Sequence, residues 1–243
     1  SAPHPPGASA PILVSGLVGQ ANDSLGLDVL ADVLPRLTPA DRAVLDDAGF
    51  QDFITIPLSQ ERGFIGEEAF LLGTIAQLVL QPEGFMGLSQ VGYFVLEPKP
   101  AALEAVAVFY RSFLLPADIA GYRGVMSRYR NLAGGMAGAS TPFPETKSGA
   151  DAIEKEVQSG RSGTLAKLLT PSVGLVLQVQ AKGLALHRAA EILVAATRAR
   201  LATGKFPESP EALVPSGLPA VPRDPFTTDQ PLTSKRTDTE WLV

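Results

Sequence analysis

Apolar residues recur at helical spacing along much of the chain, and the clearest example is the segment 64–79. One stripe has steps of four, three, four and three residues and consists of Ile65, Ala69, Leu72, Ala76 and Val79. A second, adjoining stripe consists of Phe64, Leu71, Ile75 and Leu78. Two adjoining stripes predict a helix with a wide apolar face that packs against two neighbours.

The strongest helical signal lies near the C-terminal end, in the segment 171–203. Thr170 and Pro171 are a typical helix start, because a hydroxyl residue caps the helix and proline fits its first position. No proline follows before Gly204, which is expected to cap the C-terminal end. The helix would be about 50 Å long. Its interspersed polar residues argue against a membrane span, so we expect a spine on which shorter helices pack.

Four further helices are predicted, over about 22–34, 38–48, 101–114 and 116–131. Thr38 and Pro39 form a second cap-plus-proline start. A short strand is an option at 93–96. The segment 132–150 contains several glycines and prolines and is predicted to be a loop, including the glycine-rich run 134–138.

The residues after Gly204 have a different character, because prolines punctuate them at short intervals. Ser209 and Pro210 are expected to start a single-turn helix that Pro215 stops. The prolines at 219, 222 and 225 then predict an extended strap. We expect the strap to lie across a helix and to bury its spaced apolar residues, which are Leu218, Val221 and Phe226.

The order Gly204-Lys205-Phe206-Pro207, then Leu213-Val214-Pro215 and Asp224-Pro225-Phe226, resembles the segment after the long helix in major pseudopilins of type II secretion. It is also similar to the tail of uncharacterised membrane-anchored bacterial proteins with helical bodies. The resemblance covers about residues 197–232. It implies an extracytoplasmic domain of a membrane-anchored protein, with a small β element after the strap.

Two features limit what the resemblance implies. Pseudopilins begin with the apolar helix that builds the filament, whereas about 170 residues precede the long helix here, so a filament subunit is not expected. Pseudopilins also often bind calcium after the strap, where this chain has Asp229, Asp238 and Glu240. These acids lack the regular spacing of a calcium loop, so no metal site is predicted.

Composition is consistent with a mainly α-helical fold, a bundle around one long C-terminal helix. Hydrophobic residues make up 45% of the 243, and the formal net charge is −5. We expect a flexible lead-in over 1–20, a helical domain over 21–204 and the proline-rich tail over 205–243. The absence of cysteine excludes disulfides and thiol chemistry and is compatible with export. Any signal or membrane anchor is expected upstream of Ser1.

Charge is unevenly distributed along the chain. Residues 1–100 contain 12 acidic and 4 basic side chains and net −8, whereas residues 101–243 contain 13 acidic and 16 basic side chains and net +3. The basic residues include a basic-aromatic patch of Arg123, Arg128 and Arg130 with Tyr122 and Tyr129, and Arg188, Arg198 and Arg200 on the long helix. They either meet the acidic half internally or form an interaction surface. The overall charge argues against a nucleic-acid partner.

Candidate catalytic groups are few. His187 lies within the long helix without a sequence-adjacent nucleophile or acid, so a hydrogen-bonded structural histidine is expected. Glu61, Glu67 and Glu68 could supply paired carboxylates but are expected to be solvated or ion-paired. The run 160–163 is interpreted as a turn between helices rather than as a nucleophile loop. We therefore expect no catalytic residue, cofactor or metal, and no enzyme.

These patterns predict a structural or protein-interaction domain of a membrane-associated assembly, in the periplasm or cell envelope, with a protein partner or a second copy. The alternative is a helical module that binds an apolar small molecule or lipid, suggested by the apolar faces at 64–79 and 102–113. A large apolar interface would favour the first hypothesis, and an enclosed apolar cavity would favour the second.

Overall fold

The computed structural model describes residues 13–55, 60–80, 105, 108–138, 140–170, 173–216, 218–236 and 241–243. The described chain is mainly helical, as predicted. Its α-helices are α1 (Leu13–Val33), α2 (Arg42–Leu45), α3 (Ala48–Thr55), α4 (Glu61–Leu80), α7 (Leu115–Ala137), α8 (Phe143–Gln158), α9 (Gly163–Leu169) and α10 (Val173–Thr203). Short 3₁₀ turns are η1 (Leu34–Arg36), η2 (Pro39–Asp41) and η5 (Pro210–Ser216), and η4 (Tyr110–Leu114) is π-helical.

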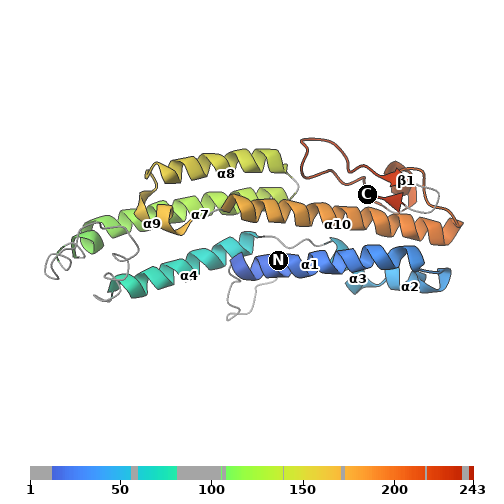
Figure 1. Ribbon diagram of the computed structural model, residues 1–243, viewed down its shortest axis with the longest axis horizontal. Helices are drawn as coiled ribbons and strands as arrows, with labels where there is room; N and C mark the ends of the chain where they lie inside the picture. Colours follow the sequence, from blue (N-terminus) through green and yellow to red (C-terminus); the bar gives the residue numbers. More distant parts are fainter. Residues whose placement is uncertain are drawn as a thin grey trace.

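The helices form an elongated bundle of three rows (Figure 1). Helices α7 and α10 make up the middle row. Helix α8 and the C-terminal strap lie on one side of it, and α4 and α1 lie on the other, with α3 and α2 beside the end of α1. Helix α10 touches α1, α3, α7, α8 and η5, so it is the spine that the sequence predicted.

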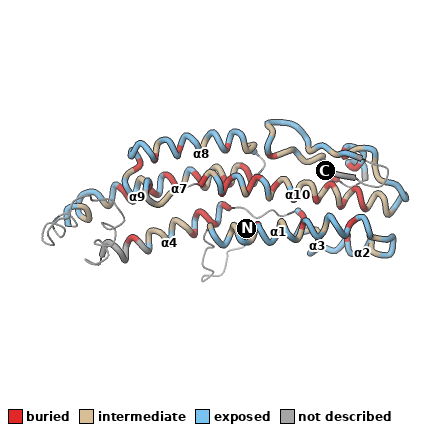
Figure 2. Tube along the Cα trace, viewed as in Figure 1, coloured by how far each residue is buried: buried red, intermediate tan, exposed pale blue. Residues whose placement is uncertain are grey.

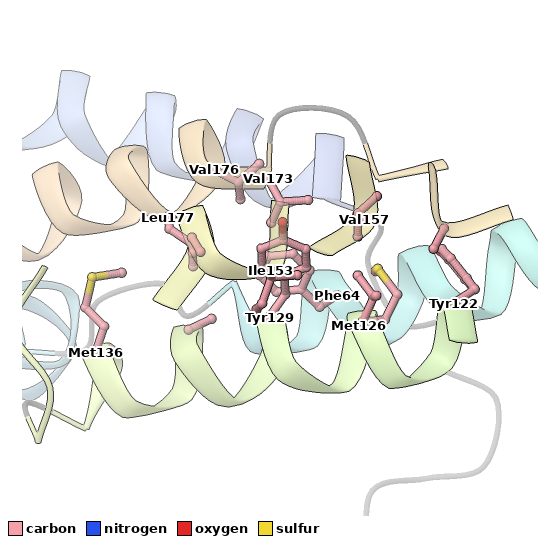
Figure 3. Close-up of a cluster of buried hydrophobic side chains, with 14 of the residues drawn as sticks. Phe64, Tyr122, Met126, Tyr129, Met136, Ile153, Val157, Val173, Val176 and Leu177 are labelled. Atoms are coloured by element: carbon pink, nitrogen blue, oxygen red, sulfur yellow. The ribbon is translucent and has the colours of Figure 1, made fainter. Parts of the chain in front are cut away.

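Three groups of buried side chains follow this spine. The largest joins α4, α7, α8 and α9 to the first half of α10 and includes Phe64, Tyr129 and Leu177 (Figure 3). The second joins the C-terminal half of α1, with α2 and α3, to Ala190 and Val194 of α10. The third packs Leu213 and Leu218 of the tail against Ile192 and Ala196.

Helix α1 begins nine residues earlier than predicted, at Leu13 rather than at about residue 22, so the predicted lead-in over 1–20 extends too far. The backbone N–H of Leu13 donates to Glu67 Oε2 of α4 at 3.3 Å, and Leu13 and Leu17 pack against the largest core. A cap supplied from 54 residues away leaves no local signal in the sequence.

The prediction of a loop over 132–150 was wrong. Helix α7 continues to Ala137, and α8 begins at Phe143. The glycines that suggested a loop are instead points of close approach. A Cβ on Gly135 would lie 2.9 Å from Thr141 Oγ1, and one on Gly149 would lie 2.9 Å from Leu132 Cδ2. Gly149 permits tight packing of α8 against α7, and Gly135 permits the connection before α8 to fold back onto the end of α7.

Only part of each predicted apolar face is buried. In α4, Phe64 and Ile75 face the core, whereas Ile65 of the other stripe is exposed. Phe109 and Phe113, from the predicted helix over 101–114, are exposed and contact each other with ring centroids 5.2 Å apart. The start of the second predicted helix is confirmed, because the backbone N–H and the hydroxyl of Thr38 both bond to Asp41 at 2.8 Å. The optional strand over 93–96 lies outside the described residues.

The tail follows its prediction only in part. Of the three apolar residues that the strap was predicted to bury, Leu218 is buried, Val221 is half-buried and Phe226 is exposed. Phe226 packs against Phe143 at the start of α8, with ring centroids 5.4 Å apart, rather than against α10.

Gly204 has a φ of +78°, and its N–H donates to the carbonyl of Arg200 at 2.7 Å, which ends α10. Helix η5 places Leu213 against α10, although Pro215 lies within this turn rather than after it. Two short antiparallel strands, β1 (Lys235–Arg236) and β2 (Trp241–Leu242), form the small β element.

Candidate functional site

His187 is a buried structural residue that connects three helices. Its Nδ1 donates to the carbonyl of Ile54 in α3, with an N···O distance of 2.9 Å. Its Nε2 lies 3.6 Å from Asp23 Oδ2 of α1, and Phe53 packs edge-on against the ring. The Nδ1 contact is a hydrogen bond, whereas the distance from Nε2 to Asp23 is too long for one. His187 is therefore the hydrogen-bonded core histidine that was expected.

The three candidate glutamates have separate surroundings. Glu67 accepts the N–H of Leu13, and Glu68 lies 3.6 Å from Arg123. Glu61 begins α4 and faces Gly134, where an added Cβ would lie 3.4 Å from Glu61 Oε2. Each carboxylate thus contacts a different part of α1 or α7, and they do not form the paired arrangement that acid–base chemistry requires.

The predicted basic-aromatic patch does not form, because its aromatic members belong to the core. Tyr122 and Tyr129 are both buried, and Tyr129 stacks on Phe64 with ring centroids 6.1 Å apart (Figure 3). Burial, with a smaller contribution from the nearby Glu154 carboxylate, raises the pKa of Tyr129 to about 12. Burial is also the main cause that raises the pKa of Tyr122.

Several of the basic residues meet acids and carbonyls of the chain itself, as the internal alternative predicts for Arg198 and Arg200. Arg198 Nε lies 3.2 Å from Asp46 Oδ1, and Arg198 also donates to the carbonyl of Leu45. Arg200 donates to the carbonyls of Leu34 and Leu37 at 3.2 and 3.0 Å. These contacts attach the acidic N-terminal half to α10.

Arg128 has an acidic partner in α8. It pairs with Glu156 at 2.6 Å, and the Ser162 hydroxyl donates to the other oxygen of the same carboxylate at 2.8 Å. Hydrogen bonds from Arg128 and then Ser162 lower the pKa of Glu156. Gly160 and Gly163 around this serine have φ values of +79° and +88°, so the run 160–163 is the turn between helices that was predicted.

Sequence reasoning missed Asp118, which is 8% exposed. Its Oδ1 accepts the N–H of Thr164 at 2.9 Å, and its Oδ2 accepts the hydroxyl of Tyr110 at 2.7 Å. The carboxylate therefore caps the start of α9 from a different helix. Burial, reinforced by this hydrogen bond, raises the pKa of Tyr110. The 46 residues between Asp118 and Thr164 leave no local pattern to reveal the contact.

The acids considered for calcium are only partly described. Asp229 pairs with Arg223 at 3.0 Å, and Asp238 and Glu240 lie outside the described residues. Within the described ranges, no three histidine, aspartate or glutamate side chains are grouped as metal ligands.

A cavity of about 350 Å³ lies between α10, the strap and the turn before α8. Arg188 and Asp224 contribute charge to its wall, and Leu184 and Val221 contribute apolar surface. Arg188 donates to the carbonyl of Arg223 at 2.7 Å, and burial lowers the pKa of its guanidinium. The wall is therefore mixed in character, unlike the lining expected for an apolar ligand.

The most unusual surface is the outer face of α1. It carries five aliphatic side chains that are 42% to 64% exposed: Val14, Val18, Leu25, Val29 and Val33. At 100° per residue, all five fall within about 100° of the helix circumference. We call this set the α1 stripe. The opposite face of the helix carries Leu27, which is buried in the second core. Figure 2 shows that most of α1 is exposed or half-buried.

The apolar residues of the predicted helix over 22–34 do not separate into two faces by spacing alone. Leu25 and Val33 recur at roughly helical spacing together with Leu27, Leu30 and Leu34, which predicts a single apolar face. In the structure, the first two are exposed and the other three belong to the core. Among the described helices, none is long and apolar enough to cross a membrane.

Comparisons with protein-family models, curated proteins and solved structures found no match for this chain.

Proposed function

We propose that this chain is a structural or protein-interaction domain that works within an assembly of the periplasm or cell envelope. In this proposal it is the extracytoplasmic part of a membrane-anchored protein. The contact with its protein partner is made by the outer face of α1. Function here lies in a surface rather than in a catalytic centre.

The observation that carries the proposal is that α1 is apolar on two opposite faces. Helices that are apolar all round are normally buried on all sides. Among the described residues, α10 and α4 cover other faces of the helix, whereas the α1 stripe leaves five aliphatic side chains exposed over 20 residues. Clustered apolar surface of this kind, interrupted here by the exposed Asn22 and Asp32, marks interaction sites in soluble proteins.

The proposed location is supported by two features of the sequence. The tail over about 197–232 resembles that of membrane-anchored bacterial proteins, and the chain contains no cysteine. The packing of Leu213 and Leu218 on α10 is consistent with the helix-plus-strap arrangement that the resemblance implies.

The alternative, a module for an apolar small molecule, has weaker support. The cavity beside the strap has a volume in the lower part of the range for small-molecule sites. Its wall includes Arg188, Arg223 and Asp224, which disfavour an apolar or lipid occupant.

Native mass spectrometry of the chain, purified gently from its source, tests the proposal. We expect a stoichiometric protein partner or a homo-oligomer. A bare monomer that carries a small extra mass would overturn the proposal and favour the ligand-binding alternative.

A further inference from the structure

The exposed positions on the outer face of α1 are arranged symmetrically about the middle of the helix. The five members of the α1 stripe, together with the exposed Asn22, occupy positions 14, 18, 22, 25, 29 and 33. Each position has a counterpart equally far from the point between Asp23 and Ser24. The pairs are 14 with 33, 18 with 29, and 22 with 25. Such a pattern is unchanged when the helix direction is reversed.

We propose that the partner of the α1 stripe is a second copy of this chain, whose α1 packs antiparallel against the first. This inference rests on the proposed function and specifies its partner. An isologous two-fold contact brings the same patch of both copies together, so the patch must be complementary to itself. In the antiparallel pair, Val18 comes level with Val29 of the second copy, and Val14 comes level with its Val33.

The charges of α1 favour the antiparallel direction. The helix contains three aspartates and no lysine or arginine, and its first ten residues are uncharged. In a parallel pair, the exposed Asp28 and Asp32 would lie level with the same residues of the other copy and would repel them.

In the antiparallel pair, both aspartates lie beside the uncharged first half of the opposite helix. The contact therefore avoids the like-charge repulsion of a parallel pair.

Asn22 is the polar position of this face that lies closest to the two-fold axis. In the antiparallel pair it comes level with Leu25 of the second copy, and the Asn22 side chains of both copies are within one helical turn of each other.

Cysteine cross-linking tests the direction and register, because the chain has no cysteine of its own. We expect Leu25→Cys to form a disulfide-linked dimer under mild oxidation, as Leu25 lies beside the two-fold axis. The double variant Val18→Cys with Val29→Cys should also cross-link. Val18→Cys alone should not, because in the antiparallel pair the two copies of residue 18 are about 16 Å apart along the helix axes.

Sedimentation velocity of the unsubstituted chain provides the second measurement. We expect reversible dimerisation, weakened at least about tenfold by Val29→Lys, which places a charge on the stripe. Val44→Lys is the matched control, because Val44 is equally exposed on α2 but lies off the stripe, and it should leave dimerisation unchanged.

Two results would overturn the inference. Cross-linking of Val18→Cys to itself would show a parallel pair. A chain that stays monomeric at about 100 µM, while native mass spectrometry finds a different protein bound, would exclude the second copy. That second result would leave the proposed function intact, so the two failures are distinguishable.

Discussion

Helices α8 and α1 lie on opposite sides of the α7–α10 row, yet their outer faces differ (Figure 1). Helix α8 buries Thr146, Ala150, Ile153 and Val157 and presents charged residues to solvent, among them the Lys147–Asp151 pair at 2.7 Å. Helix α1 also buries one face but presents aliphatic residues outward. Helix α8 thus has the polar outer face that is normal for a helix exposed to solvent. The contrast is the basis for the proposal that another protein covers the outer face of α1.

The largest expected effect is a loss of stability on substitution at the inner face of α8, compared with almost none at the outer face of α1. Ile153→Ala removes a side chain that is 2% exposed and should lower the free energy of unfolding by about 3 kcal/mol. Val29→Ala on the α1 stripe should change it by less than about 0.5 kcal/mol in the monomer. Urea denaturation at low protein concentration measures both. A loss of similar size at Val29 would show that the monomer itself buries the stripe.

The attachment of α1 to α10 depends on polar contacts at its C-terminal end. Arg200→Met retains most of the apolar stem but removes the hydrogen bonds to the carbonyls of Leu34 and Leu37, and we expect a loss of about 2 kcal/mol. Arg42→Met is the control, since Arg42 forms only an exposed pair with Asp46 at 3.9 Å. Equal losses in the two variants would contradict this contribution of Arg200.

Alkaline pH should destabilise the α7–α8 side of the molecule. The pKa of Tyr129 is about 12 in the fold, against about 10 in an unfolded chain. Between these values the unfolded state loses its proton first, so stability should fall as the pH rises from 10 to 12. One such tyrosine contributes at most about 1.4 kcal/mol per pH unit. Denaturation curves at pH 9, 10 and 11 check this, and Tyr129→Phe should have a shallower dependence.

Tyr122 offers a stabilising change in the same core. Its hydroxyl is buried and has no hydrogen-bond partner among the described residues. Tyr122→Phe removes this unsatisfied group and should raise the free energy of unfolding by about 1 kcal/mol. A decrease on thermal or chemical denaturation would indicate that the hydroxyl has a partner in solution.

The smallest effect is expected on the outer face of α8. Lys147→Ala removes one partner of an exposed i, i+4 ion pair and should cost only about 0.3 kcal/mol, less at high salt. A loss above about 1 kcal/mol would mean that this face also packs against something, and the contrast with α1 would no longer hold.

The sequence was most informative where local chemistry determines structure. The proline-free run that forms α10, the Thr38–Asp41 start and the Gly204 cap were all predicted. Predictions failed where contacts between distant residues decide the outcome. Glu67 caps α1, and Gly149 of α8 packs closely against Leu132 of α7. Neither contact has a local signature.

The sequence contains the residues of the α1 stripe but does not predict that they are exposed. The spacing of the α1 stripe is present in the sequence, but spacing alone does not distinguish a buried face from an exposed one. Leu25 and Leu27 differ by two positions, and therefore by about 200° around the helix. Only the position of α10 identifies Leu27 as the residue that is buried.

Carbene footprinting of the chain in its source material tests the central claim most directly, because carbenes label exposed aliphatic side chains. The α1 stripe should be protected there compared with the dilute isolated chain. Val44 and Leu175, exposed elsewhere on the surface, should be labelled equally in both. If the α1 stripe is labelled as strongly in its source as in isolation, no partner covers it, and the proposed interaction face is wrong.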